Sequence, residues 1–204
     1  MIVLDNGDIR FTSGRDALVF AFNVSDQAYD RPMMNRMAAP SIGKGGLAGL
    51  DAPAQAGMIR AEVQALGKLA EAIIIARIAP RSVPCHCRSA CCAGHRPNKE
   101  WTDAISVLAV YARTTALAGC TANGMMRREY VVRYFTRKDE RISLEALAEK
   151  HDIHRDTVSA HAAKVALLLG GAHPKKGKPG VPGLESAALD AIEYPLRDIG
   201  MVGQ

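Results

Sequence analysis

Cysteine is concentrated in one short segment of this 204-residue chain. Four of its five cysteines fall between positions 85 and 92, as Cys85-His86-Cys87 and Cys91-Cys92, and His95 follows closely. Thiolates are soft anionic ligands, and a reducing cytosol keeps such thiols free to bind a metal. The segment therefore predicts one structural zinc ion (Zn2+), whose tetrahedral shell takes four Cys or His ligands.

The spacing of these cysteines leaves the ligand set open. The usual local chelate is C-x2-C, whereas this chain has C-x-C and C-C. Adjacent cysteines rarely bind the same ion, so three of the four could bind together with a fourth ligand from elsewhere. The candidate ligands are Cys85, Cys87, Cys91 and Cys92, with His86, His95 and Cys120 as substitutes. Reduced structural thiols, an iron–sulfur cluster and a disulfide are the alternatives. A Cys–His nucleophile would also need an oriented base and a pocket, so we predict no catalytic residue and no enzyme.

Basic residues gather in one part of the chain. From Arg127 to Lys178 there are twelve Lys and Arg against seven Asp and Glu, an excess equal to the net charge of +5 of the whole chain. Such an excess is typical of a surface that binds phosphates, although an ordinary solvated face has the same composition. The longest apolar run, Leu69 to Ala79, is too short to cross a bilayer, and the N-terminus lacks a signal-peptide pattern. We expect a cytoplasmic protein with no membrane partner.

The first half of the chain predicts a small hairpin and two long helices. Asn6-Gly7 between short β-prone runs predicts a β-hairpin, which with a flexible arm would occupy residues 1–54. The pattern of residues 17–24 does not decide between strand and helix. Over residues 55–124, apolar spacing predicts one helix from Gln55 to Ile78 and another from Asn98 to about Leu117, on either side of the cysteine loop. The apolar stripe of the first helix would pack in the core or form the seam of a homodimer.

Residues 125–171 carry the pattern of a helix–turn–helix. An amphipathic helix follows Gly124, and Ser143 caps a short helix that ends before a longer one over residues 156–169. The motif needs a small residue, a left-handed turn position and apolar plugs between the helices. The residues at these positions are Ala148, Asp152, Ile153 and Val158. His161 stands where an aliphatic residue is expected, and we interpret it as a histidine at the core edge.

A basic Pro/Gly linker and a C-terminal helix would occupy residues 172–204, with Pro195 kinking or ending that helix. The predicted fold class is thus mainly α: a helical bundle with a cysteine-rich zinc-binding loop, a helix–turn–helix and a small N-terminal hairpin.

The second helix of a helix–turn–helix places its exposed front in the DNA major groove. Arg155 is the predicted base reader, and other cations would contact phosphates and contribute salt-dependent affinity. The predicted DNA-binding residues are Arg127, Arg128, Arg133, Arg141, His154, Arg155, Asp156, Thr157, Ser159 and Lys164. The alternative is that these are solubilising charges on an interaction domain.

Residues 127–169 resemble the helix–turn–helix of sigma-factor C-terminal domains. In this chain the cysteine cluster is followed by Asn98-x-Glu100-Trp101 and then by the helix–turn–helix. This order resembles that in phage late-gene antiterminators, the Q proteins of lambda-like phages. The resemblance covers Met58 to Leu169. It implies a transcription regulator in the cytoplasm of a bacterial host. Such a protein would bind double-stranded DNA near a late promoter, contact RNA polymerase and sigma factor, and allow terminator read-through. The alternatives are a module that inhibits or retargets polymerase or sigma without a DNA site, and a simple phage activator or repressor.

Overall fold

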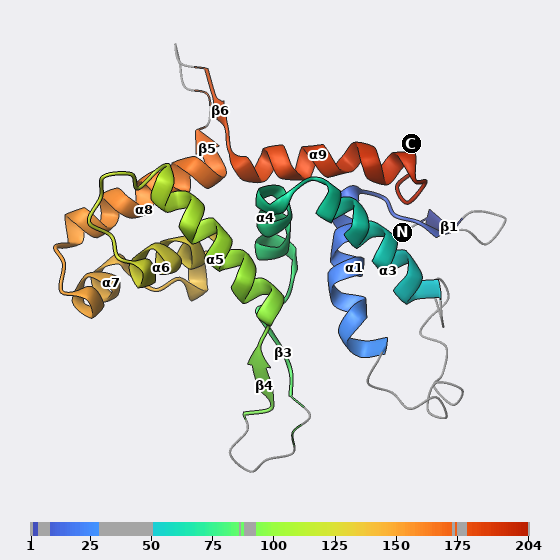
Figure 1. The fold of residues 1–204 in the computed structure, drawn as a ribbon, viewed down its shortest axis with the longest axis horizontal. Helices are drawn as coiled ribbons and strands as arrows, with labels where there is room; N and C mark the ends of the chain where they lie inside the picture. The colour runs from blue at the N-terminus through green and yellow to red at the C-terminus, as the bar shows by residue number, and fades with distance from the viewer. Residues whose placement is uncertain are drawn as a thin grey trace.

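The computed structural model describes residues 2–3, 9–28, 51–85, 87, 93–172, 174 and 179–203. Within these residues, eight α-helices surround one continuous hydrophobic core, and three two-stranded antiparallel ladders lie at its edges (Figure 1). The predicted mainly α fold is confirmed. No helix in these ranges is both long and apolar enough to cross a membrane.

The N-terminal segment belongs to the core. β1 (Ile2–Val3) pairs with β2 (Ile9–Arg10), which confirms the predicted hairpin, and the turn at residues 4–8 lies outside the described residues. α1 (Gly14–Ala28) resolves the ambiguity over residues 17–24 in favour of helix. It packs against α3 and α9 through buried side chains that include Leu18 and Phe22. The arm predicted after it lies largely in residues 29–50, which are not described.

The helix predicted over residues 55–78 is in fact two helices, α3 (Asp51–Ala65) and α4 (Lys68–Ile78). Gly67 between them has φ 89°, a left-handed value that residues with a side chain rarely adopt. The prediction of one continuous helix was wrong because the apolar spacing continues across the glycine that separates them. α3 also begins at Asp51, so residues 51–54 are helical and not part of an arm.

Two asparagine caps define the next helices. Asn98 accepts a hydrogen bond from the Glu100 amide at 3.0 Å and starts α5 (Lys99–Thr114), which ends slightly before the predicted limit. Asn123 accepts from the Met126 amide at 2.9 Å and starts α6 (Gly124–Phe135). These side chains satisfy amides that have no partner within the first helical turn. The buried indole of Trp101 donates to the Ala76 carbonyl at 3.1 Å and fixes α5 on α4.

The remaining elements complete two lobes around α4. They are β3 (Ser82–Pro84), β4 (His95–Pro97), η1 (Lys138–Glu140), α7 (Leu144–His151), α8 (Arg155–Gly170), β5 (Gly171–Ala172), β6 (Val181–Pro182) and α9 (Leu184–Asp198). α1 and α3 lie on one side of α4 and α5–α8 on the other, while α9 starts beside α8 and runs across α4 to α1 and α3 (Figure 1). Pro195 lies inside α9 without ending it. The β3–β4 hairpin projects away from the helices.

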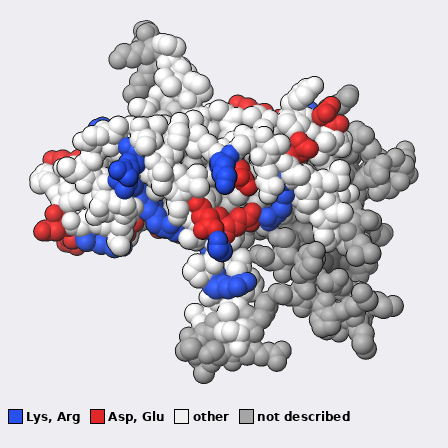
Figure 2. Space-filling model, in the orientation of Figure 1, with Lys and Arg blue, Asp and Glu red and all other residues white. Residues whose placement is uncertain are grey.

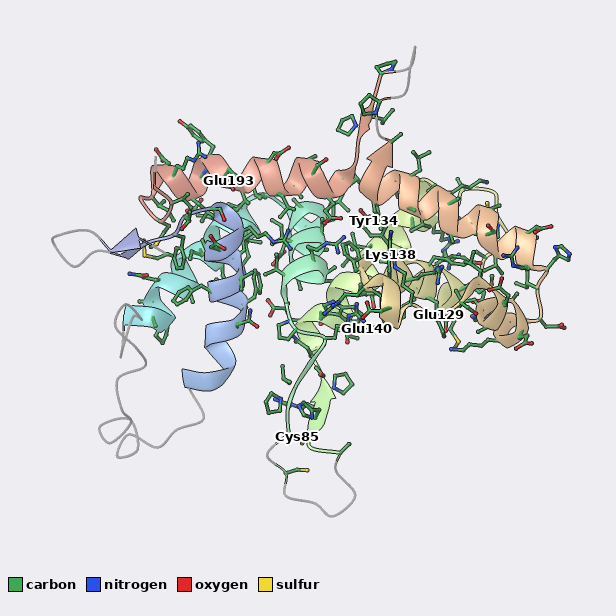
Figure 3. All side chains as sticks on the ribbon, turned by 180° about the vertical axis from the view of Figure 1, so that it is seen from behind. Cys85, Glu129, Tyr134, Lys138, Glu140 and Glu193 are labelled. Carbon is green, nitrogen blue, oxygen red and sulfur yellow. The ribbon has the colours of Figure 1, made fainter. Side chains whose placement is uncertain are left out.

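A partly buried ion pair joins α4 to α9, and a tyrosine hydroxyl of α6 binds the same carboxylate. Arg77 of α4 donates from Nε and Nη2 to the two carboxylate oxygens of Glu185 of α9, at 2.5 and 2.6 Å. Tyr134 of α6 donates its hydroxyl to the same carboxylate at 2.6 Å. Burial, together with the hydrogen bond to Glu185, raises the pKa of Tyr134 to about 12. At the other end of α9, Glu193 accepts from the Gly14 amide at 3.0 Å (Figure 3). The C-terminal helix is therefore tied to both lobes.

Candidate nucleic-acid interface and cysteine loop

α7 and α8 are joined by a three-residue turn, residues 152–154. Ser143 accepts from the Ala146 amide at 3.0 Å and caps α7, as predicted. Asp152 has φ 51° and ψ 50°, the left-handed conformation that the pattern requires at this position. Val158 is fully buried, and Ala148 is 9% exposed. The two helices therefore have the predicted turn geometry.

α6 supports this pair of helices through a carboxylate. Glu129 accepts from Lys150 Nζ and pairs with His151 Nε2, both at 2.5 Å, at the C-terminal end of α7. Burial alone would raise the pKa of Glu129, but the hydrogen bonds and charges of Lys150 and His151 outweigh it and lower that pKa. On α8, His161 is 6% exposed and its Nδ1 lies 3.4 Å from the Tyr130 hydroxyl. His161 is thus a core residue, and burial lowers its pKa.

The predicted front of α8 reaches solvent. His154 caps the helix by accepting from the Asp156 amide at 3.3 Å, and the side chains of both residues are more than three-quarters exposed. Thr157 and Ser159 are half-buried beside them. Arg155 donates from Nε to Glu145 Oε1 at 2.5 Å, so the predicted base reader is held by the first turn of α7. These residues lie together at the exposed N-terminal end of α8.

Four predicted phosphate contacts instead make hydrogen bonds inside the protein. Their guanidinium groups all donate to main-chain carbonyls of neighbouring segments. The bonds are Arg127 to Ala122 at 2.8 Å, Arg128 to Thr102 at 3.4 Å, Arg133 to Ile142, and Arg141 to Thr136 at 2.8 Å and to Tyr134 at 3.2 Å. Arg128 also donates to the Ser106 hydroxyl at 2.7 Å. These arginines hold the loop before α7 and the N-terminal half of α5 against α6.

Other cations near the motif are more exposed. Lys164 lies on the exposed side of α8, with its Nζ 3.4 Å from Cys120 Sγ. Arg137 is 78% exposed and lies 3.6 Å from Asp139. Lys138 is exposed and has no hydrogen bond or ion pair within the described part of the chain. Sequence reasoning missed Arg137 and Lys138, although their position between the amphipathic helix and the Ser143 cap was a usable signal.

Charges of both signs are interspersed on the face drawn in Figure 2. Blue and red side chains alternate over the end that carries α7 and α8, and the largest red cluster lies near the centre. The sequence-level excess of Lys and Arg therefore does not form one continuous basic area among the described residues of this face.

A groove of about 810 Å³ lies beside α6. Buried Leu147 and half-buried Val132 line it together with Met125 and Ile142, which are 62% and 47% exposed. The charged residues along it are Arg81, Arg128, Glu129, Arg133, Asp139, Glu140 and Arg141. Exposed methionine and arginine beside apolar atoms are typical of protein–protein interfaces.

The cysteine loop is closed by the β3–β4 hairpin. Pro84 pairs with His95, and the Cys85 amide donates to the Gly94 carbonyl at 2.8 Å, so both ends of the loop lie side by side. Cys85 is half-buried and Cys87 exposed. Cys85 lies toward the outer end of the hairpin, away from Glu129 and Lys138 (Figure 3). His86, Cys91 and Cys92 lie outside the described residues, and no group of three potential metal ligands occurs among the described ones.

The structure separates Cys120 from this loop. The hairpin precedes the N-terminus of α5, whereas Cys120 follows its C-terminus. A helix of 16 residues is about 24 Å long. The structure thus brings His95 to the loop but leaves Cys120 beside α8.

Comparisons of the chain with protein-family models, curated proteins and solved structures find no match.

Proposed function

We propose that this protein is a sequence-specific DNA-binding transcription regulator that uses α7 and α8 as a helix–turn–helix. The observation that carries the proposal is the turn itself. Its left-handed residue Asp152, the buried plug Val158 and the exposed helix start at Arg155 have the relationship that this motif requires. α8 is the recognition helix in this proposal.

The residues proposed to contact phosphates differ from those predicted from the sequence alone. Arg133 and Arg141 already donate to main-chain carbonyls, so their internal bonds compete with phosphate oxygens. Arg137 and Lys138 are better candidates because they are exposed in the segment between α6 and α7. We propose that these two residues and Lys164 contact phosphates, while the base edges are faced by His154, Arg155, Asp156, Thr157 and Ser159.

A salt titration tests DNA binding. Full-length protein is titrated into a labelled mixed-sequence duplex from about 50 to about 200 mM salt, and each lost phosphate contact lowers the slope of log K against log salt by about 0.9. We expect a lower slope for Lys138→Ala and an unchanged slope for the control Lys68→Ala, an exposed lysine at the start of α4 and outside the proposed interface. Binding that is absent, or that does not depend on salt, would remove the proposal.

We further propose that the cysteine loop binds one structural zinc. The hairpin register supports this, because it confines Cys85, Cys87 and His95 to one closed loop with the predicted ligands Cys91 and Cys92. Thiolate and imidazole are the ligand types of structural zinc sites, and the ion would cross-link the loop. Metal analysis of purified protein should give one zinc per chain, and chelation should lower the melting temperature. Less than about half an equivalent, with unchanged melting after chelation, contradicts the zinc site.

The proposed regulatory role is antitermination through RNA polymerase and its sigma factor. Two surfaces beyond the α8 front support a second partner: the projecting β3–β4 hairpin and the groove beside α6. This role is tested in a purified transcription reaction. The template carries a DNA site that the protein selects from a library of random duplexes, followed downstream by a terminator. Read-through that requires the site supports it. DNA binding without read-through leaves a simple activator or repressor, and polymerase binding without DNA binding leaves a protein-binding module.

A further inference from the structure

An ion pair links the first turns of α7 and α8 on the exposed side of the motif. Arg155 Nε donates to Glu145 Oε1 at 2.5 Å, and the two side chains are 57% and 59% exposed. The Glu145 backbone amide, Arg155 and Ser143 favour the ionised carboxylate and lower the pKa of Glu145. The ion pair therefore holds Arg155 against the first turn of α7.

The bond uses only one edge of the guanidinium. Its acceptor contacts Nε, and neither terminal nitrogen of Arg155 has a hydrogen-bond partner within the described residues. Arginine reads guanine in the major groove by donating two parallel hydrogen bonds to O6 and N7. The two terminal nitrogens can make such a pair while Nε stays on Glu145.

A held arginine also discriminates better than a free one. Ordering a long side chain opposes binding, and a partner that already restricts the side chain reduces this entropy loss. The negative charge of Glu145 near the DNA phosphates weakens binding to every duplex alike. The lost affinity is recovered mainly where a guanine accepts both hydrogen bonds from Arg155. A surface ion pair adds little to folding stability, which gives Glu145 no large structural role by itself.

We propose that Glu145 is a positioning residue that holds Arg155 through Nε so that its terminal nitrogens read one guanine. This inference rests on the proposed DNA-binding function of α7 and α8. It assigns Glu145, which carries the wrong charge for a phosphate contact, a role in base specificity.

The test uses full-length protein and a duplex library with a randomised core. The site selected by wild type is compared with versions in which each G·C pair is replaced in turn. For Glu145→Gln, the preference for one particular guanine should fall about tenfold, while binding to the substituted duplex stays equal or becomes tighter. The control is Asp103→Asn on α5, which removes the same charge from an exposed ion pair with Lys99, at 60% and 88% exposure.

The outcomes are distinguishable. A structural role for Glu145 at the α7 N-terminus would weaken binding to all duplexes equally and leave the guanine preference intact, and this result overturns the inference. The inference is also overturned if the control Asp103→Asn loses the guanine preference as much as Glu145→Gln does. If wild-type protein binds no duplex, the proposed function fails and the inference fails with it. Circular dichroism of Glu145→Gln confirms that the helices persist.

Discussion

Replacing Glu185 by glutamine should destabilise the protein, because it leaves the partly buried charge of Arg77 without its partner. The Arg77 and Glu185 side chains are 25% and 17% exposed and share two hydrogen bonds, and Tyr134 adds a third to the same carboxylate. Loss of one partner of a fully buried pair costs about 3–5 kcal/mol. Because both side chains are partly solvated here, we expect a loss of about 2–3 kcal/mol, or about 4–12 °C in melting temperature.

Urea unfolding at neutral pH measures this loss, with Asp190→Asn as the control. Asp190 is exposed on the same helix, so the control removes one charge from α9 without touching the ion pair. The double variant Arg77→Gln/Glu185→Gln should lose less than the sum of the two single variants, because the charge left unpaired is then gone as well. If Glu185→Gln lies within about 0.5 kcal/mol of wild type, the helix α9 is not held by this pair and the argument is refuted.

Three further predictions concern single positions. Burial lowers the pKa of His161 below its usual 6.5, so the neutral imidazole contributes to stability above that pH and this contribution declines as the pH falls. The free energy of unfolding in urea, measured at about pH 7.5 and 5.5, should therefore depend less on pH for His161→Leu than for wild type. Asp152→Val should cost about 1–2 kcal/mol, since a β-branched residue fits the left-handed turn poorly, whereas Asp152→Gly should cost no stability; equal losses in thermal unfolding would contradict this. Cys120→Ser should keep the zinc content of wild type and Cys87→Ser should lower it, which metal analysis measures; the reverse order would place the metal outside the hairpin loop.

Local signals in the sequence were enough to predict the elements that build the motif. Asn98 and Ser143 cap helices as predicted, and Asp152 takes the left-handed turn position. Each of these features depends on a few neighbouring residues, so a sequence pattern can identify it. The break between α3 and α4 was missed because the apolar spacing persists across Gly67, although that glycine was itself the signal.

The partners of long side chains could not be predicted in the same way. Arg133 and Arg141 were expected to face phosphates, but Arg133 donates to the Ile142 carbonyl of the loop before α7, and Arg141 of that loop donates to carbonyls at the end of α6. Which donors are already used depends on where that loop lies in space, and composition contains no such information. The pairing of Arg155 with Glu145 likewise appears only when α7 and α8 are packed together.

The most direct test of the central claim is site-specific photo-crosslinking to duplex DNA. The photoreactive amino acid p-benzoylphenylalanine replaces Ala160 on α8 or, as the control, Ala187 on α9, and both positions are exposed. After irradiation with a labelled duplex at low salt, we predict a protein–DNA adduct from position 160 that an excess of unlabelled selected site suppresses, and little adduct from position 187. Equal adducts from both positions, or adducts from position 187 alone, would contradict the assignment of α8 as the recognition helix.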